Sequence, residues 1–425
     1  MLETPEAVPA VQPANSGKTV LYLSRWLPYP ASNGVKQRIF NILKRLHGKG
    51  WNIHLVCCYE EGEDYQAAAP YLGQYCQKVE FFPFKPFRPR SVKALAAFLA
   101  PWPRFVIATY QAEFASIVRR ALVSGGIDVV IASEIDMVPY GRMARKFKIP
   151  AIIDDLEVGV IFDKFNKGAT FRQRLRRGLT WLKYKGYLKY LAKYFAFITV
   201  VSEQDRTFIA PLVSPTRTVI IPNGADLINK KFHPYLAEPR KNRLVFNGSL
   251  TFNLNYEAIR YFLREIYPLI RQSEPGLEML LTGRSEGVEM SGLAAANQGN
   301  LHNVKFSNYV EDVTPLITES RACVVPLLEG SGTRLKILEC FALGTPVVAT
   351  SKGAEGLDVT NGGNILLADT PQEFARAVTR LLAEPELARQ LAENARDLVE
   401  NFYDWGPIVE RLHLLLLDIT TRKVR

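Results

Sequence analysis

The residues with the clearest potential for chemistry gather in the segment 326–356, which reads PLLEGSGTRLKILECFALGTPVVATSKGAEG. A predicted strand ends at Leu327, and a predicted helix begins with Thr333 as its N-cap. The glycine-rich turn between them includes Ser331 and Gly332. Backbone N–H groups in such a turn approach a phosphate closely, and the positive end of the helix dipole attracts the anion. The pattern therefore predicts a turn that binds phosphate groups.

Charged side chains follow this turn on the predicted helix. Arg334 and Lys336 lie in its first turn, where cations oppose the helix dipole, and a bound diphosphate would reverse the sign of that effect. Glu339 lies one turn further on among apolar residues, so its carboxylate needs a polar partner, which ribose hydroxyls would provide. The alternative needs no ligand: the start of the helix is exposed to solvent, and Lys336 and Glu339 form an ion pair across one helical turn.

Further candidate donor-binding residues lie where other predicted strands end. Gly248 and Ser249 follow a strand and precede a helix, so their N–H groups would face the same phosphates. Arg284 follows another strand, where it would reach an anion. Gly34 lies in the loop after the first strand, and this loop would close over a donor if it opposed the other turn. Each also has a plain structural explanation, as a glycine that turns the chain or as a surface arginine.

Two adjacent carboxylates, Asp154 and Asp155, follow the predicted strand Ala151–Ile153. At the carboxyl end of a strand they would orient an acceptor hydroxyl or act as a base, or alternatively cap a helix. The sequence has no convincing Asp-x-Asp metal site, and its five histidines show no metal-ligand spacing. We therefore predict no metal and no cofactor.

Strands alternate with amphipathic helices almost throughout the chain, so these residues would lie at strand ends. The predicted strands are Thr19–Ser24, Asn52–Cys58, Val129–Ala132 and Ala151–Ile153 in the first half, and Leu244–Asn247, Glu278–Thr282, Ala322–Leu327 and Pro346–Ala349 in the second. This alternation predicts an α/β protein with two Rossmann-like domains, each a doubly wound parallel sheet, facing a cleft. We place a loose tail at 1–17, the first domain at 18–228, a linker at 229–243 and the second domain at 244–405.

Composition narrows the class of protein. The chain has 425 residues, 48% of them apolar and 22% charged, which is typical of globular domains and excludes disorder over most of the length. Five cysteines, an odd number without CxxC spacing, argue against a disulfide framework and favour a reducing, cytoplasmic compartment.

The net charge of +11 is concentrated in one segment, because 164–193 carries ten Lys and Arg residues and no acid. On a helical wheel this segment shows one apolar stripe, formed by Trp181, Tyr184, Leu188, Leu191 and Phe195. A basic amphipathic helix with aromatic residues at an interface suits an anionic membrane surface. The alternatives are a solvated helix whose stripe is core, and a patch that binds nucleic acid.

The segment 330–357 resembles the nucleotide-binding segment of GT-B glycosyltransferases of the group 1 (GT4-like) family. Most of 19–405 supports the resemblance through shorter matches: WLPYPASNGVKQRIFNILKRL at 26–46, SEQD at 202–205, IIPNGAD at 220–226, LVFNGSL at 244–250, LLTGR at 280–284 and NVKFSNYVEDV at 303–313.

The resemblance implies a nucleotide-diphosphate sugar donor held by the second domain, an acceptor on the side of the first, and transfer with retention and without a metal. It also implies a last helix, within 406–425, that crosses back to the first domain. Glu339 matches the second Glu of the family's E-x7-E motif, which holds the ribose, whereas Ser331 stands in place of the first. Backbone groups of 331–333 with Arg334 and Lys336 would then replace the missing carboxylate.

Two further matches concern the base and the acceptor. Tyr309 and Val310 match the place where the base stacks or bonds to the backbone, and Asp154 and Asp155 occupy the region where the family often has a histidine.

The leading hypothesis is a glycosyltransferase of the hexosyltransferase type, cytoplasmic and peripheral on the inner face of the membrane. It would transfer a sugar from UDP- or GDP-sugar to a lipid-linked or polysaccharide acceptor, in polysaccharide biosynthesis. The alternatives are a sugar-nucleotide epimerase, which shares the two-domain fold, and a nucleic-acid-binding protein that uses the segment 164–193. We expect no nucleic-acid partner under the leading hypothesis.

Overall fold

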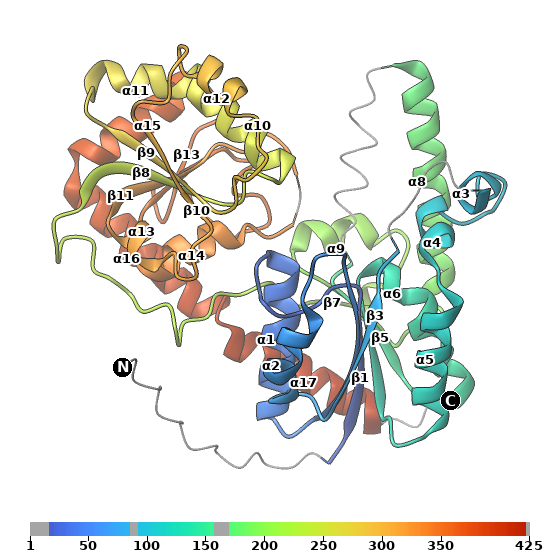
Figure 1. The fold of residues 1–425 in the computed structure, drawn as a ribbon. Coiled ribbons are helices and arrows are strands. Elements are labelled where there is room, and N and C mark those ends of the chain that lie inside the picture. Colours follow the sequence, from blue (N-terminus) through green and yellow to red (C-terminus); the bar gives the residue numbers. More distant parts are fainter. Residues whose placement is uncertain (1–16, 86–91, 157–169, 331, 422–425) are drawn as a thin grey trace.

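Two parallel sheets form the frame of the molecule in the computed structural model (Figure 1), which describes residues 17–85, 92–156, 170–330 and 332–421. The first sheet has seven strands in the order β3-β2-β1-β4-β5-β6-β7, and the second has six in the order β10-β9-β8-β11-β12-β13. Neighbouring strands are parallel throughout both sheets. The predicted fold class, with two Rossmann-like parallel-sheet domains, is confirmed.

The strands have the following bounds. The first sheet contains β1 (Thr19–Ser24), β2 (Asn52–Tyr59), β3 (Lys78–Pro83), β4 (Val129–Ser133), β5 (Ala151–Asp154), β6 (Phe197–Val200) and β7 (Thr218–Ile220). The second contains β8 (Lys241–Asn247), β9 (Glu278–Thr282), β10 (Val304–Asn308), β11 (Ser320–Val325), β12 (Val347–Ala349) and β13 (Leu366–Leu367).

Helices cover both faces of each sheet (Figure 1). Those of the first half are α1 (Gly34–Gly48), α2 (Tyr65–Gly73), α3 (Val92–Ala96), α4 (Arg104–Thr109), α5 (Ala112–Val123), α6 (Glu134–Gly141), α8 (Phe171–Leu191) and α9 (Glu203–Ile209), with 3-10 turns η1 (Arg142–Phe147) and η2 (Pro215–Arg217). Those of the second half are α10 (Asn253–Tyr261), the π-turn η3 (Phe262–Ile266), α11 (Tyr267–Ser273), α12 (Met290–Ala296), α13 (Thr314–Thr318), α14 (Leu335–Leu343), α15 (Pro371–Ala383), α16 (Pro385–Phe402) and α17 (Trp405–Thr421).

The central strands are apolar and buried on both faces, as expected where helices cover a parallel sheet on both sides. All five residues of β4 are buried, and so are five of the six residues of β1. The second sheet differs slightly from expectation, because β8 begins at Lys241 rather than at Leu244. The last residues of the predicted linker therefore belong to a strand.

The strand order reverses once in each sheet, between β1 and β4 and between β8 and β11. At such a switch point the loops after the two neighbouring strands diverge and leave room for a ligand at the carboxyl edge of the sheet. The loop after β1 leads to Gly34, the loop after β8 contains Gly248, and the loop after β11 contains the turn at 330–333. The topology thus places three of the predicted binding segments at switch points.

The chain returns to the first domain through α17 (Figure 1). Trp405, Leu412 and Leu416 are buried in the same apolar cluster as Val20 and Ile39 of the first domain. Within the described part of the chain, no helix combines the length and the apolar character needed to cross a bilayer.

One expectation about α8 is wrong. The apolar stripe predicted to face a membrane is core, since Tyr184 and Leu188 are fully buried and Leu191 and Phe195 nearly so. These side chains pack under the first sheet because α8 is the crossover helix between β5 and β6 and must cover the face of the sheet. Residues 164–169 of the basic segment lie outside the described residues.

Candidate active site

The turn of the second domain lies against the first domain at the start of α1. The N-cap of α1 is Asn33, whose side chain accepts a hydrogen bond of 3.0 Å from the N–H of Lys36. A methyl group added at Gly34, the first residue of α1, would lie 3.1 Å from Cδ1 of Leu335, the first residue of α14. The predicted opposition of these two segments is therefore present, and they meet at a distance that leaves no room for a side chain without adjustment.

The glycine-rich turn has a backbone that only glycine adopts readily. Gly330 and Gly332 have φ values of 101° and 85°, in the left-handed region. Ser331 lies outside the described residues. A methyl group at Gly330 would also come within 2.9 Å of Leu254 Cδ1 on α10, so the turn packs closely against that helix.

The cap of α14 differs from the prediction, because Arg334 and not Thr333 is the N-cap residue. The N–H of Leu335 bonds to the carbonyl of Thr333 at 3.0 Å, which tightens the chain just before the helix. Thr333 Oγ1 is buried without a hydrogen-bond partner, and no side chain caps the helix. The N–H of Ile337 also bonds to a backbone carbonyl, that of Arg334 at 2.9 Å, so an anion at this helix start would share or replace these backbone bonds.

Arg334 folds back over the turn that precedes it. Its Nη2 donates to the carbonyl of Lys352 at 3.4 Å, and both terminal nitrogens lie 3.3 Å from the position of a methyl group at Gly330. Lys352 in turn forms an ion pair with Glu355, which accepts a hydrogen bond of 2.8 Å from Gln204 of α9. Arg334 is thus held near the turn and near a contact between the two domains.

Lys336 points toward the end of β8 and not toward Glu339. Its Nζ donates to Asn255 Oδ1 at 2.9 Å, stands 3.9 Å from the centre of the Phe246 ring, and lies 2.7 Å from the position of a methyl group at Gly248. Burial lowers the pKa of Lys336 to about 7, and the positive charge of Arg334 acts in the same direction. A diphosphate beside Nζ would stabilise the charged form and restore the pKa.

Glu339 already has two partners within the protein. Its carboxylate pairs with Lys230 at 2.9 Å and accepts a hydrogen bond from Asn247 Nδ2. Asn247 in turn accepts from Thr282 Oγ1 at 3.1 Å. The ion pair with Lys336 that the spacing allowed is not formed. Lys230 and Asn247 were missed by the sequence analysis, in which the only indication was that Glu339 needed a polar partner.

The other predicted donor-binding residues gather at the same edge of the second sheet. Ser249 Oγ donates to the carbonyl of Arg284 at 3.1 Å, and the guanidinium of Arg284 lies 5.6 Å from the centre of the Tyr309 ring. Tyr309 is 52% exposed, and Val310 is half-buried. The carboxyl ends of β8, β9 and β10 thus carry neighbouring candidate groups for the base and phosphates.

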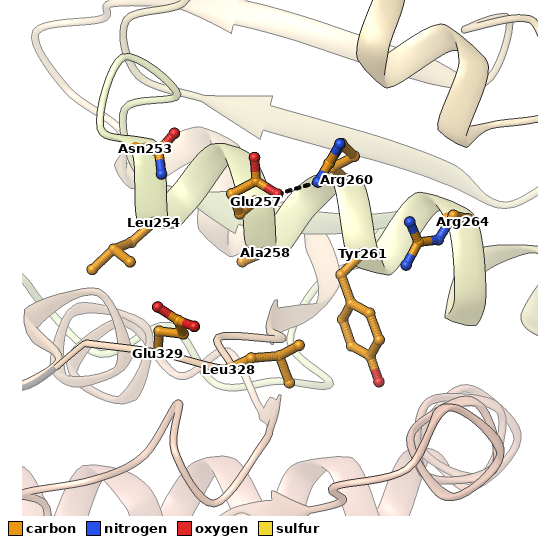
Figure 2. A pocket seen from close by; sticks show the side chains of 9 residues that line it. All are labelled: Asn253, Leu254, Glu257, Ala258, Arg260, Tyr261, Arg264, Leu328 and Glu329. Atoms are coloured by element: carbon orange, nitrogen blue, oxygen red, sulfur yellow. Dashed lines mark hydrogen bonds and ion pairs between the residues drawn. The ribbon is translucent and has the colours of Figure 1, made fainter. Parts of the chain in front are cut away.

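A pocket of about 260 Å³ adjoins the turn. Figure 2 shows Leu254 and Tyr261 of α10 pointing toward the loop that carries Leu328 and Glu329, the two residues before Gly330. Glu257 forms an ion pair with Arg260 on this helix, which leaves the lining mixed in charge. The lining residues are Asn253, Leu254, Glu257, Ala258, Arg260, Tyr261, Arg264, Leu328 and Glu329.

On the side of the first domain, Asp154 is not available for chemistry. It is completely buried and forms two bonds of 3.0 and 2.7 Å with Nε and Nη2 of Arg38. It also accepts a bond of 2.6 Å from Thr199 Oγ1. Arg38, equally buried, further donates to the carbonyl of Ile221 and to Asn223 Oδ1. Since both carboxylate oxygens are engaged in this buried network, the geometry favours a role for Asp154 in positioning the loops around it over the catalytic role predicted from the sequence.

Asp155, in contrast, keeps one oxygen without a partner. Its Oδ1 is buried and has no hydrogen-bond partner, while Oδ2 lies 3.8 Å from Arg38 Nε. Burial raises the pKa of Asp155 to about 6; the positive charge of Arg38 lowers it, and the negative charge of Asp154 raises it. Its φ of 56° is a left-handed conformation, which is strained for a residue other than glycine. Strain and a raised pKa are typical of functional positions, so Asp155 remains the acceptor-side candidate.

A second polar cluster at this edge was missed by the sequence analysis. The Arg25 guanidinium lies 3.9 Å from the Trp26 ring and bonds to Glu60 at 2.6 Å. Trp26 Nε1 donates to Glu134 Oε2 at 2.8 Å, and burial raises the pKa of Asp136. The sequence does contain an indication of this cluster, because two carboxylates, Glu134 and Asp136, follow the predicted strand Val129–Ala132. Asp154 and Asp155 follow the strand Ala151–Ile153 in the same way. Among the described residues, His, Cys, Asp and Glu form no group of three that could hold a metal ion.

Comparison with known families gives two matches. The model described as "Glycosyl transferases group 1" matches residues 241–384, and the model described as "Glycosyltransferase Family 4" matches residues 32–228. The two matches divide the chain much as its two sheets do.

Curated relatives are distant in sequence. A protein of Klebsiella pneumoniae described as an uncharacterized 44.6 kDa protein in the cps region is 20% identical over 394 residues, which is 91% of this chain and 96% of that protein. The phosphatidyl-myo-inositol mannosyltransferase of Mycobacterium leprae is 24% identical over 313 residues, covering 72% of this chain and 77% of the relative.

Solved structures share the fold. The chain aligns with HepE of Anabaena in complex with UDP and glucose at a TM-score of 0.65 and 18% identity, over 94% of this chain and 100% of that one. It aligns with WaaG, a glycosyltransferase involved in lipopolysaccharide biosynthesis, at a TM-score of 0.63 and 15% identity, over 93% and 99% of the two chains.

Proposed function

The chain belongs to the group 1, GT4-like glycosyltransferases, and we propose that it transfers a sugar from a nucleoside diphosphate sugar to a lipid-linked or polysaccharide acceptor. The observation that carries this proposal is the position of Lys336. Its Nζ lies at the end of β8 beside Gly248, and Lys336 is the second residue of a helix that has no side-chain cap. These groups converge from two switch-point loops on one place, which suits a diphosphate.

The proposed chemistry is displacement at the anomeric carbon. The bond between that carbon and the terminal phosphate oxygen breaks, and an acceptor oxygen forms the new bond. The departing diphosphate gains negative charge, which Lys336, Arg334 and the N–H groups of α14 would stabilise. These groups would supply the positive charge for which other enzymes use a metal, so we propose transfer without one.

Asp155 would receive the acceptor hydroxyl on the side of the first domain. Its free Oδ1 would accept a hydrogen bond from that hydroxyl and take up its proton as the glycosidic bond forms. With a pKa raised to about 6, Asp155 is ionised at neutral pH and is a stronger base than an ordinary aspartate. We retain the proposal of retention, which requires the acceptor oxygen to approach the anomeric carbon from the same face that the diphosphate leaves, with a hexose as the transferred sugar.

The names of similar proteins suggest which donors and acceptors to test first. HepE has been solved with UDP and glucose and also with UDP-glucose, which favours testing uridine donors first. The phosphatidyl-myo-inositol mannosyltransferase favours a lipid-linked acceptor. Glu339, with Lys230 and Asn247, would bind the ribose by exchanging one of its present partners.

Calorimetric titration with UDP, GDP, ADP, CDP and TDP tests the proposal. We expect one or two of them to bind, and Lys336→Ala to weaken that binding, while Arg380→Ala, at an exposed position of α15, leaves it unchanged. Absence of binding by all five would contradict a nucleotide-sugar donor. Conversion of the donor into its epimer in the absence of an acceptor would favour the epimerase alternative.

A further inference from the structure

The amino-terminal half of α8 carries an apolar stripe that the protein does not cover. Leu175, Leu179 and Leu182 are 66%, 51% and 64% exposed. At 100° per residue they fall within about 60° of one another around the helix axis. The buried residues Tyr184 and Leu188 lie about 180° away, on the side that packs against the domain. The helix therefore has two apolar faces, of which only one is used for folding.

Cationic side chains flank the exposed stripe on both sides. Arg176 and Lys183 lie about 90° to one side of it, and Arg174 and Lys185 about 90° to the other. No acidic residue occurs anywhere in α8. An apolar stripe between two rows of cations matches the interface of a bilayer, where leucines enter the acyl region and cations meet lipid phosphates.

A neighbouring segment extends the apolar surface. Lys183 Nζ donates to the carbonyl of Phe98 at 2.6 Å, which fixes the segment after α3 beside α8. Val92, the first residue of α3, is 84% exposed, and Leu99, in the segment after it, is 95% exposed. Figure 1 shows α3 and the amino-terminal part of α8 protruding from the same side of the first domain. Exposed apolar surface contributed by two adjacent elements is typical of an interaction site.

We propose that this surface, formed by Leu175, Leu179 and Leu182 with Val92 and Leu99 and their flanking cations, binds an anionic lipid bilayer. This places the membrane contact on the face of α8 opposite to the stripe favoured by the sequence. Charge complementarity selects the partner, since the cations would repel a basic surface and the leucines gain little from an RNA backbone.

The surface lies on the same edge of the first domain as Asp155. Asp155 follows β5 at the carboxyl edge of the sheet, and α8 is the crossover from β5 to β6, so it runs antiparallel to the strands. Its carboxyl-terminal half packs on the sheet, and its exposed half therefore lies toward the carboxyl edge. The inference deepens the proposed function, because a bilayer there would bring a lipid-linked acceptor to the cleft.

Vesicle flotation with the full chain tests the inference. The probes are vesicles of phosphatidylcholine alone and vesicles that also contain about 30% phosphatidylglycerol. We expect binding to the anionic vesicles, weakened about 100-fold when Leu175→Ser, Leu179→Ser and Leu182→Ser are combined. Combining Arg174→Gln, Arg176→Gln and Lys185→Gln should also weaken binding about 100-fold, at about fivefold for each cation, and only on anionic vesicles.

The matched control combines Leu236→Ser and Leu414→Ser, which are 52% and 57% exposed at other places on the surface. It should bind vesicles as the unaltered protein does. Undiminished binding by the triple leucine variant would overturn the inference, as would RNA binding or dimerisation that depends on these leucines without any vesicle binding. Nucleoside diphosphate affinity, measured in parallel, should be the same in all variants, so that failure here and failure of the proposed function are distinguishable.

Discussion

Donor affinity should depend on pH through Lys336. In the free enzyme burial disfavours the charged ammonium and lowers the pKa of Lys336 to about 7, whereas a bound diphosphate favours the charged form. Binding of a nucleotide sugar is therefore coupled to proton uptake. Below this pKa the lysine is already charged and contributes no pH dependence; above it, affinity falls as pH rises.

The magnitude follows from the fraction of charged lysine. With a pKa of about 7, about half of the molecules carry a charged Lys336 at pH 7 and about 1% at pH 9. If binding requires the charged form, affinity should fall about 50-fold over this interval, and about half a proton should be taken up per donor bound at pH 7.

Calorimetry in two buffers of different ionisation enthalpy measures both quantities. Nucleotide sugars suit the assay because their diphosphate has no proton that titrates in this range. In Lys336→Arg the guanidinium stays charged, so the slope with pH should disappear. Lys241→Ala, which removes an exposed lysine of the same domain, should retain the slope. A wild-type affinity that does not change with pH, or a slope retained in Lys336→Arg, would refute the reasoning.

Three further predictions concern the first domain. Asp154→Asn should lower the free energy of unfolding by about 3–5 kcal/mol in urea denaturation, because Arg38 loses its buried partner; a change below about 1 kcal/mol would contradict that pairing. Asp155→Asn should slow transfer without changing donor affinity, and the wild-type rate should rise with pH through about 6 as the carboxylate ionises; an unchanged rate argues against its role. Gly34→Val should lower kcat by crowding the domain contact, while Gly48→Val, where an added Cβ has no atom within 4 Å, should not; equal effects would show that the contact is unimportant.

Much of the fold could be predicted, because the spacing of apolar residues along the chain indicates which side of a strand or helix is buried. The strands β1 and β9 match their predicted bounds, and the signal Thr370-Pro371 marks the start of α15, where Thr370 and Glu373 form a capping box. The pattern after the loop at 248–255 predicts one helix that runs to about Gln272, whereas the structure interrupts it with the π-turn η3 just before Pro268. Proline lacks an N–H and crowds the preceding turn, and a π-turn accommodates this locally.

The orientation of α8 could not be predicted from the helical wheel. The wheel shows an aromatic stripe and a leucine stripe on opposite sides, and either can be the buried one. Tertiary packing decides: Tyr184 and Leu188 pack under the sheet, and Leu179 remains exposed. The membrane environment favoured for the first stripe is wrong, and the alternative in which this stripe is core is confirmed.

The site was predictable where it depends on local sequence and not where it depends on distant partners. The turn at 330–333 and its opposition to Gly34 follow from strand ends and topology. The bond between Arg38 and Asp154 joins residues 116 apart, and the bond between Asn247 and Glu339 joins residues 92 apart. No spacing rule reaches such pairs, so the saturation of Asp154 and the partners of Glu339 became visible only in three dimensions.

The central claim is that Lys336 and the turn before it bind the diphosphate of the donor. The most direct test compares the affinities of the nucleoside monophosphate and diphosphate of the preferred base, for the wild type and for Lys336→Ala, at one pH. We expect the diphosphate to bind the wild type more tightly than the monophosphate does. The ratio of the two affinities should be at least about tenfold smaller in Lys336→Ala. An equal ratio in both proteins would contradict the claim.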